Sequence, residues 1–297
     1  MSTMTRRGFF KHSAGLAAAL GGTAACRAWA DAPGAKMRFG LVTYLWGQDW
    51  DLPTLLKNCE TSGALGVELR TTHAHGVEPH LNAAERAEVK KRFDDSPVVL
   101  VGLGSNERFD DPDPDKLNAA IEATKAFVKL SHDVGGSGVK VKPNAFHEGI
   151  SHETTIAQIG ASLNTLGAFG ADYGQQIRLE VHGRETQELP VIKAIMDVAD
   201  HPNVGVCWNS NPPDLHGQGL EHNFNLVKDR MGATAHVREL HAGTYPYHEL
   251  MALFVAMDYD GWILIEASSK PKDRVKALAE QRQVWEGMVA KAQAALE

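Results

Sequence analysis

The sequence Asp258-Tyr259-Asp260-Gly261-Trp262-Ile263-Leu264-Ile265-Glu266 shows the pattern that decides the fold. A polar turn leads into a short run of bulky apolar residues, as expected of a buried strand, and a carboxylate ends the run. Similar β-rich runs recur along the chain. Eight strands are predicted, at residues 37–46, 66–70, 98–104, 138–142, 177–182, 204–209, 236–241 and 262–267.

Amphipathic stretches separate these runs and predict helices. They lie at residues 51–62, 81–93, 115–132, 154–173, 188–199, 221–230, 247–257 and 272–296. Strands that alternate with helices are typical of a parallel sheet. No Gly-x-Gly-x-x-Gly loop follows the first strand, which disfavours a doubly wound open sheet. Eight successive units therefore predict an α/β protein with a single (β/α)8 TIM barrel over residues 31–297.

The N-terminal residues 1–30 are typical of an export signal. Arg6 and Arg7 precede a weakly apolar stretch, and Ala-Trp-Ala at 28–30 matches a cleavage pattern. The apolar stretch is too short for a transmembrane helix, which needs about 20 residues. We expect a twin-arginine signal, a periplasmic mature protein and no membrane span. Lipidation at Cys26 is the weaker alternative, because Thr stands three residues before it, where such signals usually carry Leu.

The charge of the chain argues against nucleic acid as a partner. The formal net charge is −7 at pH 7, and loss of residues 1–30 removes four basic residues and no acidic one, which leaves −11. Such a protein is poorly suited to a phosphate backbone. Cys59 and Cys207 remain after cleavage, and their pairing cannot be read from the sequence. The sequence leaves open whether the protein forms a homo-oligomer.

Acidic side chains stand at the ends of two predicted strands. In a barrel of this kind the active site forms at the carboxyl ends of the strands. Glu180 and Glu266 lie there in apolar contexts. A buried carboxylate is strongly destabilising unless it is paired or bound to a cation. A metal ion is the simplest common partner, so the sequence predicts a metal site at this end of the barrel.

The order of these residues is similar to the metal-binding set of the xylose-isomerase-like superfamily, which includes ketose epimerases and inosose dehydratases. The stretch 258–266 also resembles the strand-eight signature of that superfamily. The resemblance implies four metal ligands: Glu180, Asn209, His241 and Glu266. Asn209 departs from the family, which commonly has Asp, so Asn209, Asn211 and Asp214 stay open as the third ligand. Two carboxylates, an amide oxygen and an imidazole suit Mn²⁺, Co²⁺, Mg²⁺ or Zn²⁺.

The resemblance also implies a chemistry for this site. A divalent ion polarises a sugar carbonyl and stabilises the enediolate formed when the neighbouring C–H proton is removed. By analogy, Glu180 and Glu266 act as acid and base on opposite faces of the substrate. We expect an isomerase or epimerase, or, if a β leaving group is present, a lyase or dehydratase acting on a 3-keto-glycoside or inosose. Because no Gly-rich or Arg-clustered phosphate site is visible in the sequence, the expected substrate is a non-phosphorylated sugar or glycoside.

Several further residues near strand ends are candidates for substrate binding. His182 shares strand parity with Glu180, and Lys142 shares it with Lys140, so each pair faces one side of its strand. The stretch that follows strand two is rich in polar side chains, with Glu68 among them, and Trp46 at the end of strand one is able to stack on a sugar ring. The substrate-binding residues we expect are His182, Lys142, Arg70, His73, His75 and Trp46.

Two other classes of function compete with a sugar-converting enzyme. An apurinic endonuclease of the same barrel family requires a trinuclear zinc site and a basic groove, and the acidic charge disfavours the groove. A non-catalytic sugar-binding barrel is suggested by the neutral Asn209. Loss of Glu180 or Glu266 separates binder from enzyme, because only an enzyme would lose turnover.

Overall fold

The computed structural model describes residues 32–296, and the expected signal at 1–30, with Cys26, lies outside the described residues. Eight parallel strands form a closed barrel in chain order, because β1 pairs with both β2 and β8. This confirms the predicted (β/α)8 barrel. The strands are β1 Arg38–Val42, β2 Gly66–Arg70, β3 Val99–Arg108, β4 Gly138–Lys142, β5 Gln176–Glu180, β6 Val204–Asn209, β7 Met231–Val237 and β8 Trp262–Ile265.

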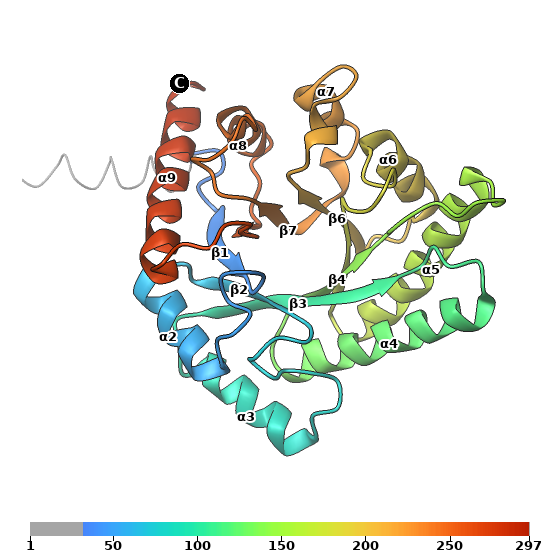
Figure 1. The fold of residues 1–297 in the computed structure, drawn as a ribbon, viewed down its shortest axis with the longest axis horizontal. Coiled ribbons are helices and arrows are strands. Elements are labelled where there is room, and N and C mark those ends of the chain that lie inside the picture. Colours follow the sequence, from blue (N-terminus) through green and yellow to red (C-terminus); the bar gives the residue numbers. More distant parts are fainter. Residues whose placement is uncertain (1–31, 297) are drawn as a thin grey trace, which may run out of the picture.

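Helices cover the outside of the barrel (Figure 1). They are α2 Leu52–Ser62, α3 Ala83–Asp94, α4 Pro114–Asp133, α5 His152–Asp172, α6 Leu189–Val198, α7 Leu220–Asn225, α8 Tyr247–Ala256 and α9 Arg274–Ala294, with short 3-10 turns at Pro212–Leu215 and Lys228–Arg230. The first and last of them, α2 and α9, lie side by side and close the outer ring. In the described part of the chain no helix is long and apolar enough to cross a membrane.

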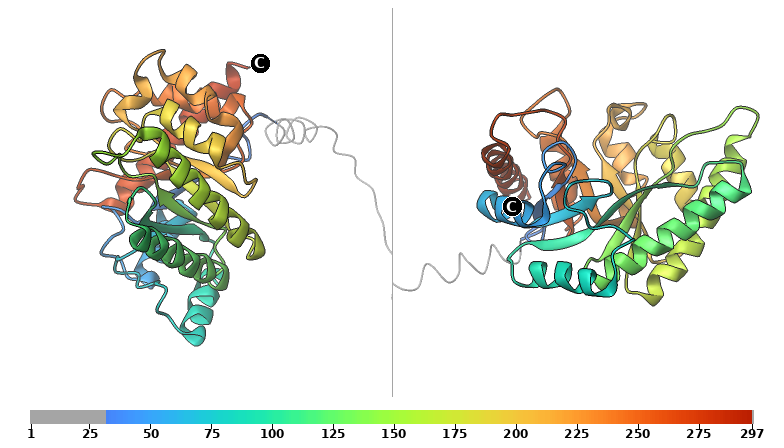
Figure 2. Two further views of the ribbon diagram at one scale, coloured as in Figure 1. Left: turned by 90° about the vertical axis from the view of Figure 1, so that its right-hand side faces the viewer. Right: turned by 60° about the horizontal axis from the view of Figure 1, so that its bottom comes forward.

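Local sequence explains where the helices begin. Asp51 accepts a hydrogen bond from the Thr54 backbone N–H at 2.9 Å and caps α2. Asn82 and Glu85 form a reciprocal capping box at the start of α3. Such caps satisfy backbone donors that have no partner inside the helix. The helices therefore start close to the predicted positions, and Figure 2 shows them in an outer layer around the strands.

The predicted position of strand seven is wrong. We expected a strand over 236–241, but β7 runs from Met231 to Val237 and ends before His241. Its pairing partners set this position, since Asn209 of β6 lies opposite His236 and Ile265 of β8 lies opposite Val237. The chain after Val237 leaves the sheet. The histidine on strand seven is therefore His236.

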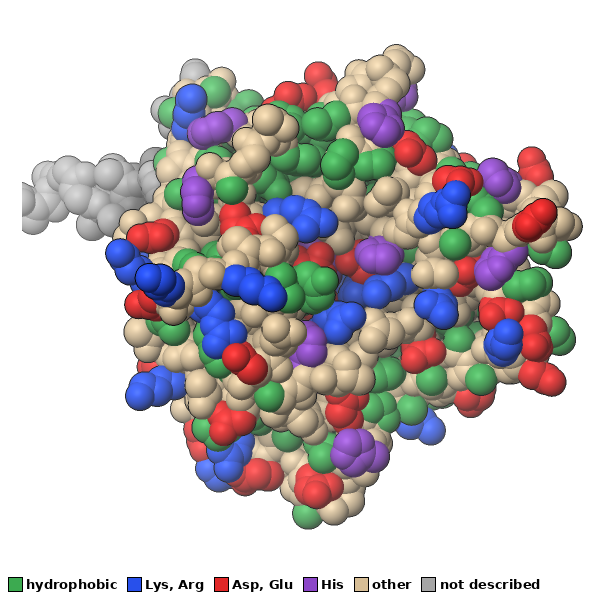
Figure 3. Space-filling model, viewed as in Figure 1, with side chains coloured by type: hydrophobic (Ala, Val, Ile, Leu, Met, Phe, Trp, Pro, Cys, Tyr) green, Lys and Arg blue, Asp and Glu red, His purple; other side chains and the backbone are tan. Residues whose placement is uncertain are grey.

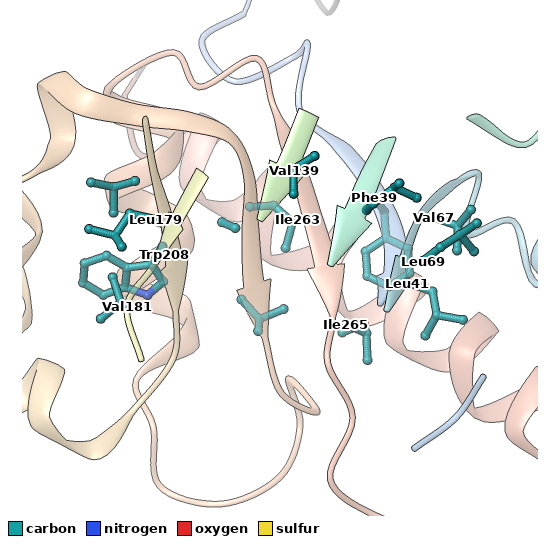
Figure 4. Packing of buried hydrophobic residues seen from close by; sticks show 14 of the residues in the cluster. Phe39, Leu41, Val67, Leu69, Val139, Leu179, Val181, Trp208, Ile263 and Ile265 are labelled. Atoms are coloured by element: carbon teal, nitrogen blue, oxygen red, sulfur yellow. The ribbon is translucent and has the colours of Figure 1, made fainter. Parts of the chain in front are cut away.

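The main core lies between the strands and the helices. Apolar residues of alternate positions point outward from the barrel, and Figure 4 labels several of them: Phe39, Leu41, Val67, Leu69, Val139, Leu179, Val181, Trp208, Ile263 and Ile265. Because successive side chains of a strand point to opposite faces, the residues between them point into the barrel. Glu180, between Leu179 and Val181, is one of these.

Two large side chains, Arg178 and Trp262, fill the barrel interior near the amino ends of the strands, which we call the lower end. The end at the carboxyl ends of the strands is the upper end. Arg178 donates to the Val101 carbonyl at 3.1 Å and to the Ser137 hydroxyl at 2.7 Å, and its Nε donates to Gln176 Oε1 at 3.0 Å. Trp262 fits beside Gly66, where a Cβ would lie 2.3 Å from the indole. The lower end of the barrel is therefore closed by packing. Inside the barrel, space for a ligand remains at the upper end, where the polar residues that end the strands lie.

Candidate active site

A cavity of about 580 Å³ opens at the carboxyl ends of the strands. Its lining residues come from seven of the strands or the loops that follow them: Tyr44, Arg70, Lys140, Lys142, Glu180, His182, Gly183, Arg184, Gln187, Asn209, Asn211, Arg238 and Glu266. Cavities of this size suit small molecules. A larger hollow of about 840 Å³ lies near the start of β7 and contains none of these strand-end residues.

Glu180 is the centre of a buried polar cluster. Its Oε2 accepts a hydrogen bond from the Lys140 ammonium at 2.8 Å, and its Oε1 accepts one from Asn209 Nδ2 at 2.8 Å. His236 Nδ1 lies 3.5 Å from the same Oε1. Burial raises the pKa of Glu180, but Lys140 and His236 outweigh it and hold that pKa well below its usual value. Glu180 is therefore ionised.

Glu266 differs from Glu180 in the direction of its pKa shift, although both side chains contact the amide of Asn209. Its Oε2 accepts from Asn209 Nδ2 at 3.2 Å, and its side chain is half-buried at the cavity. Burial and the Glu180 charge together raise its pKa above the usual value. Two neighbouring carboxyls whose pKa values move in opposite directions are typical of an acid and base pair.

His236 is held by a second carboxylate, that of Glu68. The distance from His236 Nε2 to Glu68 Oε2 is 3.3 Å, and both side chains are fully buried. This contact fixes the ring so that Nδ1 faces Glu180, and Nδ1 has no hydrogen-bond partner among the described residues. A carboxylate that orients a histidine whose other nitrogen is free is the usual support of a metal ligand.

The donor set fits a divalent metal ion. Glu180, His236 and Glu266 each offer one ligand atom, and these atoms lie within 4.8 Å of one another. When fully ionised, Glu68, Glu180 and Glu266 carry three negative charges against the one ammonium of Lys140. Without a metal, the raised pKa values of Glu266 and His236 favour bound protons on these two groups, and a divalent cation would take the place of those protons. Asn209 Oδ1 is buried and has no partner. The cluster therefore suits such an ion in both charge and free donor atoms.

Asn209 is the only one of the three candidate third ligands that lies in this cluster. Asn211 Nδ2 donates to the backbone carbonyls of Val181 and Asn209, which uses its amide to hold the loop after β6. Asp214 Oδ2 accepts from the Asn211 backbone N–H at 2.8 Å and from the Tyr245 hydroxyl at 2.7 Å. Burial raises the pKa of Asp214 to about 7. Both residues have structural contacts of their own.

His241 is not brought to the cluster. It is exposed, beyond the end of β7, and its Nδ1 contacts Gln281 of α9. We expected His241 to supply the strand-seven ligand because we placed strand seven too far along the chain. In the structure, His236 is the strand-seven histidine that lies beside Glu180. The alternation of apolar residues with Thr234 and His236 was the signal for the correct position.

Three of the expected substrate-binding residues line the cavity: Arg70, Lys142 and His182. His73 stands behind Arg70, since Arg70 Nη1 lies 3.3 Å from His73 Nε2, and Thr43 Oγ1 lies 3.2 Å from His73 Nδ1. Burial lowers the pKa of His73 to about 4, with Arg70 and His75 adding to the effect. His73 is therefore neutral at pH 7 and supports Arg70.

His75 and Trp46 do not line the cavity. The His75 ring is buried, with Nε2 bonded to the Arg70 carbonyl at 2.8 Å and Nδ1 accepting from the Val77 backbone at 3.0 Å. Trp46 is buried and donates to the Ser269 carbonyl at 3.0 Å. Both side chains stabilise loops at the rim. Sequence reasoning also missed Arg238, which lines the cavity from just beyond β7.

The fold and this cluster can now be compared with known proteins. The family profile described as "Xylose isomerase-like TIM barrel" matches residues 56–287, most of the chain. The chain belongs to this family. No curated protein gives a significant sequence match to it.

Solved structures of this xylose isomerase-like barrel are similar over nearly their whole length. The 3-keto-D-glucoside 4-epimerase YcjR from E. coli is 14% identical, with a TM-score of 0.72, over 84% of this chain and 99% of that one. An L-ribulose 3-epimerase is 14% identical, with a TM-score of 0.74, over 88% and 97%. The IolI protein, solved "with a binding zinc atom", is 15% identical, with a TM-score of 0.72, over 86% and 99%. At these identities the likeness shows the fold.

Proposed function

We propose that this protein is a sugar isomerase or epimerase that moves a proton at a carbon next to a carbonyl group. The observation that carries the proposal is the pair Glu180 and Glu266, two carboxyls that contact one amide nitrogen, that of Asn209, at the inner end of a cavity. The names of the similar structures, two sugar epimerases among them, support a sugar as substrate.

The two carboxyls divide the proton transfer. Glu180 is ionised, so it accepts the proton of the C–H bond beside the carbonyl. Glu266, whose pKa is raised, donates a proton to the carbonyl oxygen, and an enediol results. For epimerisation, the enediol hydroxyl returns its proton to Glu266, and Glu266 then delivers it to the opposite face of the same carbon, which inverts that carbon. For isomerisation, Glu180 delivers its proton to the neighbouring carbon while the other hydroxyl gives its proton to Glu266, which moves the carbonyl. Lys140 keeps Glu180 charged and in place.

A divalent metal ion would be held by Glu180, His236 and Glu266, with the side-chain amide of Asn209 supplying a fourth donor. Its contribution when bound is to polarise the carbonyl and so to ease removal of the neighbouring proton. Glu68 contributes by fixing the His236 ring at 3.3 Å. The proposed ions are Mn²⁺, Co²⁺, Mg²⁺ and Zn²⁺, since carboxylate, amide and imidazole donors suit each of them.

Solvent exchange tests this function. Purified protein is incubated in D₂O with a panel of free ketoses and 3-keto-glucosides, and deuterium incorporation beside the carbonyl is followed by NMR. We expect incorporation with the parent, and a loss of at least about 10²-fold in Glu180→Gln and Glu266→Gln, the usual contribution of a general acid or base. The control is Glu249→Gln, an exposed change on α8.

The same experiment separates the competing activities. Release of the aglycone from a 3-keto-glucoside would identify a lyase. Sugar binding without exchange, unchanged in both glutamine variants, would contradict the enzyme and leave a sugar-binding barrel. Elemental analysis of the parent and both variants identifies the metal, and we expect near-stoichiometric metal only in the parent.

We also propose that residues 1–30 direct export to the periplasm by the twin-arginine route. The Arg6-Arg7 pair and the cleavage pattern at 28–30 support this. Replacement of both arginines by Lys should retain the full-length chain in the cytoplasm, as judged by cell fractionation. Processing that is unchanged in this variant would contradict the route.

A further inference from the structure

The cavity is more basic than the protein that surrounds it. The chain carries a formal net charge of −7, yet the cavity lining has two carboxylates, Glu180 and Glu266, and five basic side chains: Arg70, Lys140, Lys142, Arg184 and Arg238. Figure 3 shows Lys and Arg side chains gathered around the centre of the face seen in Figure 1. A basic cavity in an otherwise acidic protein attracts anions to that cavity.

Most of this positive charge is not balanced by protein carboxylates. Lys140 is paired with Glu180, and Arg184 lies 3.7 Å from Glu185 at the exposed rim. Within residues 32–296, by contrast, Arg70, Lys142 and Arg238 have no carboxylate oxygen within 4.0 Å. Arg70 and Lys142 are half-buried, whereas Arg238 is exposed. Since most half-buried cations in proteins are paired, these two groups beside one cavity point to a partner that comes from outside.

Two of these cations converge on one point. Arg70 Nη2 and Lys142 Nζ both donate to Asn106 Oδ1, at 3.3 Å and 3.2 Å. They come from β2 and β4, and Asn106 lies on β3 between them. An amide oxygen is neutral and leaves the repulsion between the two cations uncompensated. An anionic oxygen at the cavity side of Asn106 would interact with both cations.

Neighbouring side chains hold the guanidinium group of Arg70 in place beside the cavity. The Tyr44 ring lies 5.5 Å from its guanidinium carbon, and His73 Nε2 lies 3.3 Å from Nη1. A fixed guanidinium binds carboxylate or phosphate through paired hydrogen bonds. Lys142 adds a point charge beside it. The arrangement therefore has the donors for one anionic group.

The position relative to Glu180 fits a group on the substrate. Lys142 is two residues beyond Lys140 on the same face of β4, which places their Cα atoms roughly 7 Å apart along the strand. Lys140 contacts Glu180. Lys142 and Glu180 line the same cavity, so an anionic group at Lys142 and a reacting carbon at Glu180 could belong to one sugar.

We infer that Arg70 and Lys142 form a binding subsite for an anionic group of the substrate, a carboxylate or a phosphate, so that the substrate is an acidic sugar. The inference rests on the proposed function for the identity of the ligand as a sugar. The expectation of a non-phosphorylated sugar relied on the absence of a cluster of basic residues in the sequence, and β2 and β4 create that cluster in space.

Calorimetric titration tests the subsite with three probes: D-glucuronate, D-glucose 6-phosphate and D-glucose. We expect one anionic probe to bind at least tenfold more tightly than glucose, and the one that does identifies carboxylate or phosphate. Lys142→Gln and Arg70→Gln should each weaken that binding at least tenfold and leave glucose unchanged. Arg92→Gln, which removes one exposed charge on α3, should bind like the parent.

Three results would overturn the subsite. They are equal affinity for glucose and both anions, anion binding that both glutamine variants retain, and no binding of either anion at millimolar concentration. Thermal unfolding of each variant shows whether the fold is intact. Glu266→Gln separates this inference from the proposed function, because it should keep anion binding and lose deuterium exchange. Anion binding in a parent that shows no exchange with any keto sugar, including keto sugars that carry the anionic group that binds, would retain the subsite and reject the isomerase.

Discussion

The two ends of the barrel interior use buried charge in opposite ways. Arg178 and Glu180 lie two residues apart on the same face of β5, and each is 1% exposed. Arg178 donates to fixed groups, namely a backbone carbonyl, a hydroxyl and an amide. Glu180 instead contacts groups that titrate or reach the cavity, Lys140 and His236 among them.

The difference shows that burial of a charge does not mark function by itself. At the lower end the glycines Gly66, Gly102 and Gly138 make room for Trp262 and Arg178, and every polar group of Arg178 has a partner. At the upper end Asn209 Oδ1 and His236 Nδ1 are buried without partners. Unsatisfied buried atoms are costly, so they indicate the end that is completed by a ligand.

The largest effect on stability is expected from removal of the cation at the upper end, Lys140. Lys140→Met should lower the free energy of unfolding by about 3–5 kcal/mol, because it leaves Glu180 buried without its charge partner. Chemical denaturation measures this. Lys91→Met, which removes an exposed lysine paired with Asp95, should change stability by less than about 1 kcal/mol. A loss as small in Lys140→Met as in the control would contradict the role given to the pair.

Asp214 behind the cavity should make stability depend on pH. Its folded pKa, about 7, exceeds the usual value of 3.8 for an aspartate, so the folded state binds the proton more tightly. This contribution to stability is full below about pH 4 and is lost as the pH rises to about 7. Between pH 4 and 8 the parent should lose roughly 4 kcal/mol more than Asp214→Asn, at about 1.4 kcal/mol per pKa unit. Parallel curves for the two proteins would contradict this.

Metal binding should increase the free energy of unfolding through the residues at the upper end. At a free concentration of Mn²⁺ about 100 times its Kd, the free energy of unfolding should rise by about 2.7 kcal/mol above that of EDTA-treated protein. His236→Gln should abolish this increment, whereas His241→Gln should keep it. Loss of the increment in the His241 variant instead would restore the sequence-based ligand assignment.

A smaller change tests the packing of the lower end. Gly66→Ala places a methyl group 2.3 Å from the Trp262 indole and should lower stability by about 1–3 kcal/mol. Deuterium exchange per folded molecule should stay near the parent value, because the site lies at the other end. Gly287→Ala, an open position on α9, should raise stability by about 0.5–1 kcal/mol. Equal effects of the two changes would contradict the close fit at Gly66.

Much of the fold and part of the site could be predicted from local patterns. The β2, β4 and β6 boundaries match their predictions because turn residues and apolar runs define these strands on both sides. Glu180 and Glu266 were found because a carboxylate that ends an apolar strand needs a partner. His236 was missed because Val-Arg-Glu-Leu after it extends the apparent strand, while the pairing with β6 and β8 ends it at Val237.

The sequence by itself determined the alternation of strands and helices, and with it the barrel, because hydrophobic periodicity and turn residues act locally. It also placed two carboxyls at strand ends. The tertiary structure alone decided that His236 and not His241 lies beside Glu180, that Lys140 pairs with Glu180, and that Arg70 and Lys142 meet at Asn106. The physical reason is that these contacts join different strands, so they depend on the register and closure of the barrel, which no single segment encodes.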